Sequence, residues 1–98
     1  MLDLKRLTYL TALYHHRSYT KASEELFVTQ PAISLAVKAL ERQTGIQLLD
    51  RQANGVVFTP EGEQYVLHAQ HILQECEKTE TILQELSTQW QQTLHLGI

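Results

Sequence analysis

The stretch between Gly62 and Gly97 contains neither glycine nor proline, the residues that most readily interrupt a helix. Within it, mostly apolar residues recur at alternating steps of four and three, the heptad spacing of helices that pack along one another. They are Tyr65, Ala69, Ile72, Cys76, Thr79, Leu83, Leu86 and Trp90. The spacing predicts a helix over 60–92, and roughly 30 helical residues at about 1.5 Å each make a rod about 45 Å long.

This helix is too long to lie wholly on the rest of the chain. A compact domain built from the preceding residues would be only about 25 Å across, so the helix is expected to project beyond it. A projecting apolar stripe needs a second surface to cover it, and a second copy of the chain is the simplest one. The eight residues of the heptad seam are therefore the predicted homodimer interface.

The first 45 residues are predicted to form three shorter helices. The first spans about 3–15, and the second begins at a cap provided by Thr20 or Ser18. Thr29 is placed to cap the third helix, whose first turn tolerates Pro31 because no N–H is needed there, and Gly45 is placed to end it. In the third helix Ile33, Val37 and Leu40 recur at helical spacing and face the core, which leaves Gln30, Ser34, Lys38 and Glu41 on the outward face.

Residues 46–59 change character. Two β-prone runs, IQLLDR and VVFT, flank a polar segment that contains Asn54-Gly55, a strong β-hairpin signal. Thr59-Pro60-Glu61 then marks the start of the long helix. The chain is therefore predicted to be mainly α. Residues 1–59 form a winged helix-turn-helix domain of three helices and a β-hairpin wing, with the helix-turn-helix at about 19–38 and the wing at about 46–59; a dimerising helix follows at 60–92.

The charge is distributed unevenly along the chain. The formal net charge is −3, but residues 1–51 hold seven of the eight Lys and Arg residues against five acids, a net of +2. Residues 52–98 hold one lysine against six glutamates, a net of −5. The basic half is the candidate nucleic-acid binder, although +2 is a modest charge for that role.

Together these residues resemble the LysR-type transcriptional regulators of bacteria. The resemblance covers nearly the whole chain and runs through these blocks: L-K-R-L-x-Y-L (4–10), S-Y-T-K-A-S-x-x-L (18–26), V-T-Q-P-A-I-S (28–34), L-E (40–41), G-I-x-L-L-x-R (45–51), T-P-E-G (59–62) and H-A (68–69). The blocks at 18–26 and 28–34 are the most specific. It implies a cytoplasmic, nucleoid-associated regulator that binds promoter DNA and pairs its linker helices antiparallel in a dimer, often in a tetramer of two dimers. Residues 93–98 would then begin an effector-binding domain that responds to a small molecule.

The resemblance also implies roles for single residues. The third helix would enter the major groove, where Gln30 has the paired donor and acceptor that suit adenine and Pro31 suits a thymine methyl. The start of the second helix would bind phosphate. The predicted DNA-binding residues are Ser18, Thr20, Lys21, Thr29, Gln30, Pro31, Ser34, Leu35, Lys38 and Asn54. On spacing alone Gln30 and Ser34 could equally be polar surface, and Thr20 and Lys21 a plain cap and a solvated lysine; Arg51 is expected to be structural.

Two of these residues depart from the family pattern. Leu35 and Asn54 stand where the family usually carries a basic residue, so we expect DNA binding to be weaker or less sensitive to salt than in a basic relative. The rival prediction is a helical dimerisation module with little or no DNA affinity. If the helices pair antiparallel, the two copies of Cys76 lie near the dyad, and oxidation is predicted to crosslink them.

Other function classes have little support in the sequence. His68, His71 and Glu75 are spaced for a helical metal site, but residues of this kind on an exposed helix are more often polar surface. Cys76, the single cysteine, lies on the packing seam, and no activating base is evident for it. The chain is therefore predicted to be no enzyme, to need no cofactor and to use no membrane.

Overall fold

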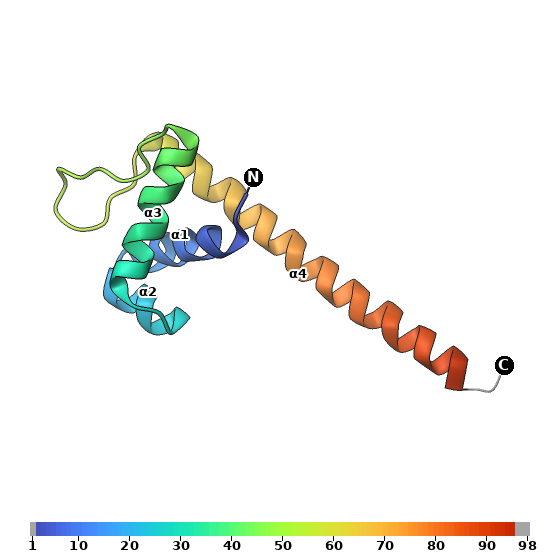
Figure 1. The fold of residues 1–98 in the computed structure, drawn as a ribbon. Coiled ribbons are helices and arrows are strands. Elements are labelled where there is room, and N and C mark those ends of the chain that lie inside the picture. The colour runs from blue at the N-terminus through green and yellow to red at the C-terminus, as the bar shows by residue number, and fades with distance from the viewer. Residues whose placement is uncertain (1, 96–98) are drawn as a thin grey trace.

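The computed structural model describes residues 2–95, which fold into four helices (Figure 1). They are α1 (Leu4–His16), α2 (Tyr19–Leu26), α3 (Gln30–Thr44) and α4 (Pro60–His95). Helix α1 is central, since it contacts each of the other three, and α2 and α3 also pack against each other. The predicted winged helix-turn-helix with a long fourth helix is confirmed.

The helix boundaries follow from local chemistry. Ser18 caps α2 by accepting a hydrogen bond from the Lys21 N–H (3.1 Å), so Ser18 and not Thr20 is the cap. The Thr29 hydroxyl oxygen accepts from the Ala32 N–H (3.3 Å) at the start of α3, and Gly45 ends that helix with a φ of 72°. Both predictions for α3 are thus confirmed.

The core lies where α1, α3 and the start of α4 meet. Ile33, Val37 and Leu40 are fully buried, as the spacing predicted. Five more large side chains complete the buried centre: Leu7, Leu10, Leu13, Leu48 and Val66. Because Leu48 comes from the base of the wing and Val66 from α4, these two elements share one core with the helix-turn-helix.

The wing is shorter as a sheet than expected. Within the described residues, pairing over 46–59 is limited to one antiparallel bridge, between Leu49 and Phe58. One backbone hydrogen bond lies just beyond it, from the Asp50 N–H to the Val57 carbonyl (2.8 Å). Residues 50–57 form a loop that extends beside α3, on the side away from α4 (Figure 1).

The turn chemistry explains the missing ladder. A two-residue hairpin turn of the type that Asn-Gly favours needs positive φ at both positions, but only Gly55 has one (78°). Asp50 instead starts its own turn, because its carboxylate accepts the Gln52 N–H (3.0 Å) and its carbonyl accepts the Ala53 N–H (3.3 Å). The chain therefore leaves the ladder directly after the bridge.

Helix α4 projects from the domain, as predicted, and the molecule measures 65 × 26 × 18 Å. The helix continues through 93–95, where the following domain was expected to begin; residues 96–98 of that expected segment lie outside the described part. Across residues 2–95, no helix combines the length and apolar character that crossing a membrane requires.

Candidate nucleic-acid interface

The N-terminal ends of α2 and α3 meet at an exposed surface. The Gln30 side-chain amide nitrogen donates to the Thr20 hydroxyl oxygen (3.1 Å), which links the first turns of the two helices. Ser18 and Thr29 use their oxygens to cap α2 and α3, so each hydroxyl proton remains available for an outside acceptor. The N-termini of α2 and α3 thus meet at one surface. Four polar side chains lie there: Ser18, Thr20, Thr29 and Gln30.

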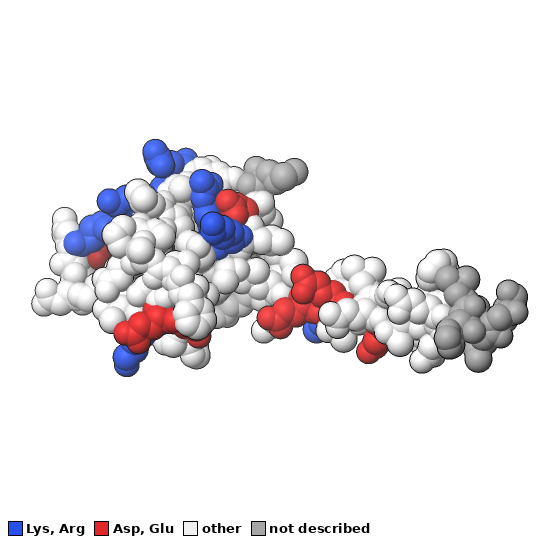
Figure 2. All heavy atoms as spheres, turned by 60° about the horizontal axis from the view of Figure 1, so that its bottom comes forward, with Lys and Arg blue, Asp and Glu red and all other residues white. Residues whose placement is uncertain are grey.

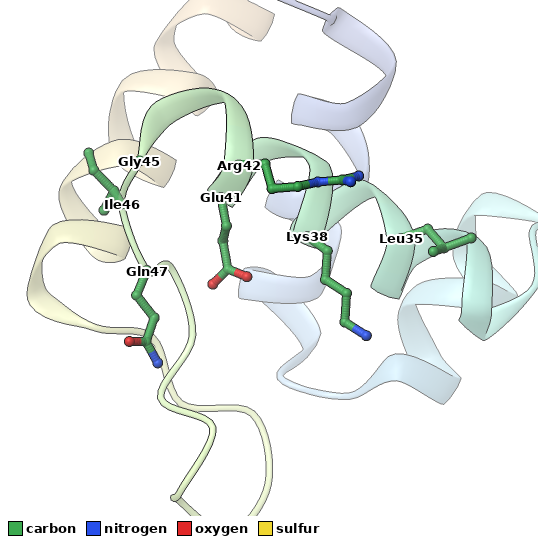
Figure 3. Close-up of a pocket in the computed structure, with 7 residues that line it drawn as sticks. All are labelled: Leu35, Lys38, Glu41, Arg42, Gly45, Ile46 and Gln47. Carbon is green, nitrogen blue, oxygen red and sulfur yellow. The ribbon is translucent and has the colours of Figure 1, made fainter.

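The outward face of α3 continues this surface. Pro31 and Lys38 are exposed, Ser34 is half-buried, and Leu35 has 65% of its surface exposed. An open groove of about 650 Å³ runs between α3 and the start of the wing, and its walls are Leu35, Lys38, Glu41, Arg42, Gly45, Ile46 and Gln47 (Figure 3). Apart from Glu41, whose side chain turns to the wing, the residues predicted to face outward from α3 do so.

Three cationic residues near Leu35 were not among the predicted site residues. Arg42 is exposed and lines the groove one turn after Lys38. Lys5 and Arg6, at the start of α1, line a hollow whose opposite wall includes Leu35. Leu35 is therefore an apolar residue between two basic groups. Helical spacing would have revealed Arg42, but Lys5 and Arg6 reach this surface only because α1 packs on α3.

The basic and acidic halves of the sequence also lie in different parts of the molecule. On the face drawn in Figure 2, most Lys and Arg side chains gather over the globular part, together with some acidic ones, whereas acidic side chains predominate on the projecting helix. Within residues 2–95, Lys21, Lys38 and Arg42 take part in none of the ion pairs, which leaves their charges open to an anion. Arg6 pairs loosely with Asp3 (3.6 Å) at the edge of the hollow.

Glu41 and Arg51 form an internal ion pair, which agrees with the structural role expected for Arg51. The guanidinium Nη2 lies 2.6 Å from the Glu41 Oε1. Burial alone would raise the pKa of the Glu41 carboxyl, but hydrogen bonds from Arg51 and from the Leu48 and Leu49 amides outweigh it, so this pKa lies below its usual range. Asn54 is exposed on the wing loop.

The eight seam residues of α4 fall into two groups. Ala69 is only 2% exposed, so its assignment to the dimer interface was wrong: packing in this chain's own core leaves no surface for a partner. Tyr65 and Ile72 pack partly against the same core. Cys76 is half-buried, and the remaining seam residues are exposed: Thr79, Leu83, Leu86 and Trp90.

The histidines of α4 do not gather into a ligand set. His68 and His71 are both exposed. Within the part of the chain that the structure describes, no three His, Cys, Asp or Glu residues are grouped so as to hold a metal ion.

Comparison with known proteins gives one consistent result. Residues 4–63 match the family model described as bacterial regulatory helix-turn-helix protein, lysR family. The chain is 37% identical over 97 residues to the HTH-type transcriptional regulator YraN of Bacillus subtilis, covering 99% of this chain and 34% of that protein. It is 33% identical over 101 residues to the DNA-binding transcriptional dual regulator OxyR of Escherichia coli, covering 99% and 32%.

Solved structures agree with the sequence matches. The DNA-binding domain of BenM in complex with benA site 1 DNA superposes with a TM-score of 0.83 at 31% identity, covering 88% of this chain and 97% of that one. Full-length OxyR C199D from Pseudomonas aeruginosa gives a TM-score of 0.82 at 30% identity, covering 87% and 29%. The chain spans about a third of the length of the curated relatives that it matches.

Proposed function

Because the chain belongs to the lysR family of bacterial helix-turn-helix regulatory proteins, we propose that it binds double-stranded promoter DNA as a homodimer and regulates transcription. The observation that carries the proposal is the surface where the N-terminal turns of α2 and α3 meet, joined by Gln30 and Thr20. In this fold, the N-terminal residues of the second helix of the motif meet base edges in the major groove.

Gln30 is the proposed base-reading residue. One of its amide protons is held by Thr20, so its carbonyl oxygen and its second amide proton remain for a base edge, the pairing that suits adenine. Thr20 accepts this bond and keeps its own proton for a phosphate. Pro31 and Ser34 lie on the same face of α3 and complete the contact with the groove.

Phosphate contacts are proposed on both sides of this centre. Lys21 and the capped N-terminus of α2 form one anion site. Lys38 and Arg42 line the groove beside the wing and form another. Such contacts hold the protein on the duplex without reading its sequence. A net charge of −3 is therefore compatible with DNA binding, because the basic residues gather on the globular part.

The proposed dimer pairs the two α4 helices antiparallel about their middle, and the distal part of each helix supplies exposed apolar surface for the contact. Four large apolar side chains there are more than half exposed: Ile82, Leu83, Leu86 and Trp90. A stripe of this kind along a projecting helix is typical of a helix that pairs with another. In the full-length protein, a tetramer and a small-molecule effector bound by a following domain are part of the same proposal, as is an action at the nucleoid in the cytoplasm.

The proposal is tested by anisotropy titration at two salt concentrations, with DNA from upstream of the protein's own gene and a scrambled duplex of equal length. We expect tighter binding to the upstream DNA at both salt concentrations, and weaker binding to either duplex at the higher one. A dimer that binds neither duplex at low salt would favour the rival function, a dimerisation module without DNA affinity.

Replacing Leu35 with arginine is expected to strengthen DNA binding. The new guanidinium would lie between Lys38 and Lys5 and reach a phosphate, so the slope of log affinity against log salt should steepen by about one. Leu67→Arg is the matched control, because it adds the same charge at a half-exposed leucine on α4. An equal gain for both variants would mean that only net charge matters.

Oxidation is expected to crosslink two chains through Cys76. If the α4 helices pair antiparallel, these thiols lie near the dyad, and mild oxidation should give a covalent dimer on non-reducing gels. Leu86→Glu should abolish the crosslink by burying a charge in the interface, whereas Glu85→Gln, one residue away and off the seam, should not. A monomer band alone in the parent protein would contradict antiparallel pairing at this register.

A further inference from the structure

One carboxylate joins the recognition helix α3 to the wing. The Glu41 side chain accepts hydrogen bonds from the Leu48 N–H (2.8 Å) and the Leu49 N–H (3.3 Å) through Oε2. Its other oxygen, Oε1, accepts from the Arg51 guanidinium at 2.6 Å. The Glu41 side chain is only 17% exposed, so the carboxylate is largely withdrawn from water and its bonds are strengthened.

The wing has few other fixed points beyond its base. Leu48, Leu49 and Phe58 are buried and hold the base in the core. The loop of residues 50–57 leaves that base after a single bridge. Its Val56 packs partly against the core, and the Asp50–Val57 bond joins the two sides of the loop only to each other. Arg51 lies just past the bridge, and its bond to Glu41 ties the loop sideways to α3.

From this arrangement we infer that Glu41 is a positioning residue for DNA binding, which fixes the angle between the wing and α3 and so the spacing at which the two reach the duplex. The inference rests on the proposed function. Arg51, which lines no part of the groove with Lys38 and Arg42, is assigned to this anchor and not to a phosphate. Asn54, which is exposed on the loop, is then held over the DNA flank.

The anchor is tested with Glu41→Gln and Arg51→Gln. Glutamine keeps one oxygen for a backbone N–H but presents an amide to the second partner, so Glu41→Gln cannot serve all three donors. Arg51→Gln removes only the sideways tie. We expect faster amide hydrogen exchange at residues 50–57 in both variants without DNA, with protection in α1 and α3 unchanged. Glu85→Gln, an exposed carboxylate on α4, is the control.

DNA binding separates positioning from a purely structural role. The variants are titrated with a full promoter duplex and with a duplex shortened at its ends so that the flank under the wing is missing. We expect Glu41→Gln to bind the full duplex about tenfold more weakly and the shortened one within twofold of the parent protein. An equal loss on both duplexes, or no loss on either, would overturn the inference.

The same experiment distinguishes the two proposals. If the parent protein fails to prefer promoter DNA over a scrambled duplex, the proposed function fails, and the DNA-binding part of the inference fails with it. The exchange measurement needs no DNA, so it still decides whether Glu41 holds the wing. Unchanged exchange at 50–57 in Glu41→Gln would refute the anchor even if promoter binding is specific.

Discussion

Replacing Gly62 with alanine is expected to destabilise the domain by about 3 kcal/mol, near the upper end of typical overpacking effects. A Cβ built on Gly62 would lie far inside van der Waals contact distance of the Leu48 carbonyl oxygen and 2.9 Å from the Leu48 Cα. The obstacle is backbone, which cannot move away as the tip of a flexible side chain can. The Thr59 N–H donates to the same Leu48 carbonyl (3.0 Å), so a shift there would also disturb the cap of α4.

The sign of this effect is informative. Alanine in a helix is ordinarily more stable than glycine by up to about 1 kcal/mol, so without the clash Gly62→Ala should stabilise the protein. Urea unfolding followed by circular dichroism measures the change in the free energy of unfolding. Glu61→Ala is the control, because Glu61 is exposed in the same turn and its replacement should have a small effect. A gain in stability for Gly62→Ala would show that α4 does not approach Leu48 this closely.

Replacing Gln30 with alanine is expected to weaken binding to promoter DNA by about 10- to 100-fold. A bidentate contact between a side chain and a base contributes about 1–3 kcal/mol of discrimination. Binding to the scrambled duplex should stay the same, because Gln30 carries no charge for phosphate. For the same reason the salt dependence should not change. The fold should remain intact, since Gln30 is exposed and the α3 cap is Thr29.

Two comparisons make this result decisive. Gln64→Ala removes a glutamine that is also exposed, from α4, and should leave promoter affinity unchanged. Thr20→Val removes the acceptor that holds the Gln30 amide, so it should also reduce promoter affinity, by less than Gln30→Ala. If Gln30→Ala weakens binding to promoter DNA and to scrambled DNA by the same factor, Gln30 supports binding in general and does not read bases.

Sequence reasoning succeeded where structure is determined locally. The caps at Thr29 and Gly45 and the position of Pro31 depend on residues within a few steps, so the ends of α3 were predictable. Its buried face was also predictable, because helical spacing alone separates Ile33 and Val37 from the outward residues. The same argument missed Glu41, since spacing places it outside and only the path of the wing brings three donors to it.

Long-range packing accounts for the other differences. A heptad seam shows which face of α4 is apolar but not what covers it, and here the chain's own core already buries Ala69. The basic hollow at Lys5 and Arg6 depends on how α1 crosses α3, which no local pattern records. In the wing, the Asn-Gly signal was outweighed by the turn that Asp50 starts earlier in the chain.

Because Val66 and Ala69 are buried in the common core, the start of α4 is fixed to the globular part while the rest of the helix projects from it. Tyr14 adds a brace, because its hydroxyl donates to Glu63 (2.9 Å) and its ring meets Phe58 edge-on. The globular part must therefore rotate together with α4. The 36 residues of α4 give an arm about 54 Å long, so a tilt of about 4° at its distal end displaces α3 by about 4 Å, close to one base-pair step. In the proposed dimer, a small change in the angle between the two α4 helices would therefore change the spacing at which the two recognition helices meet the DNA.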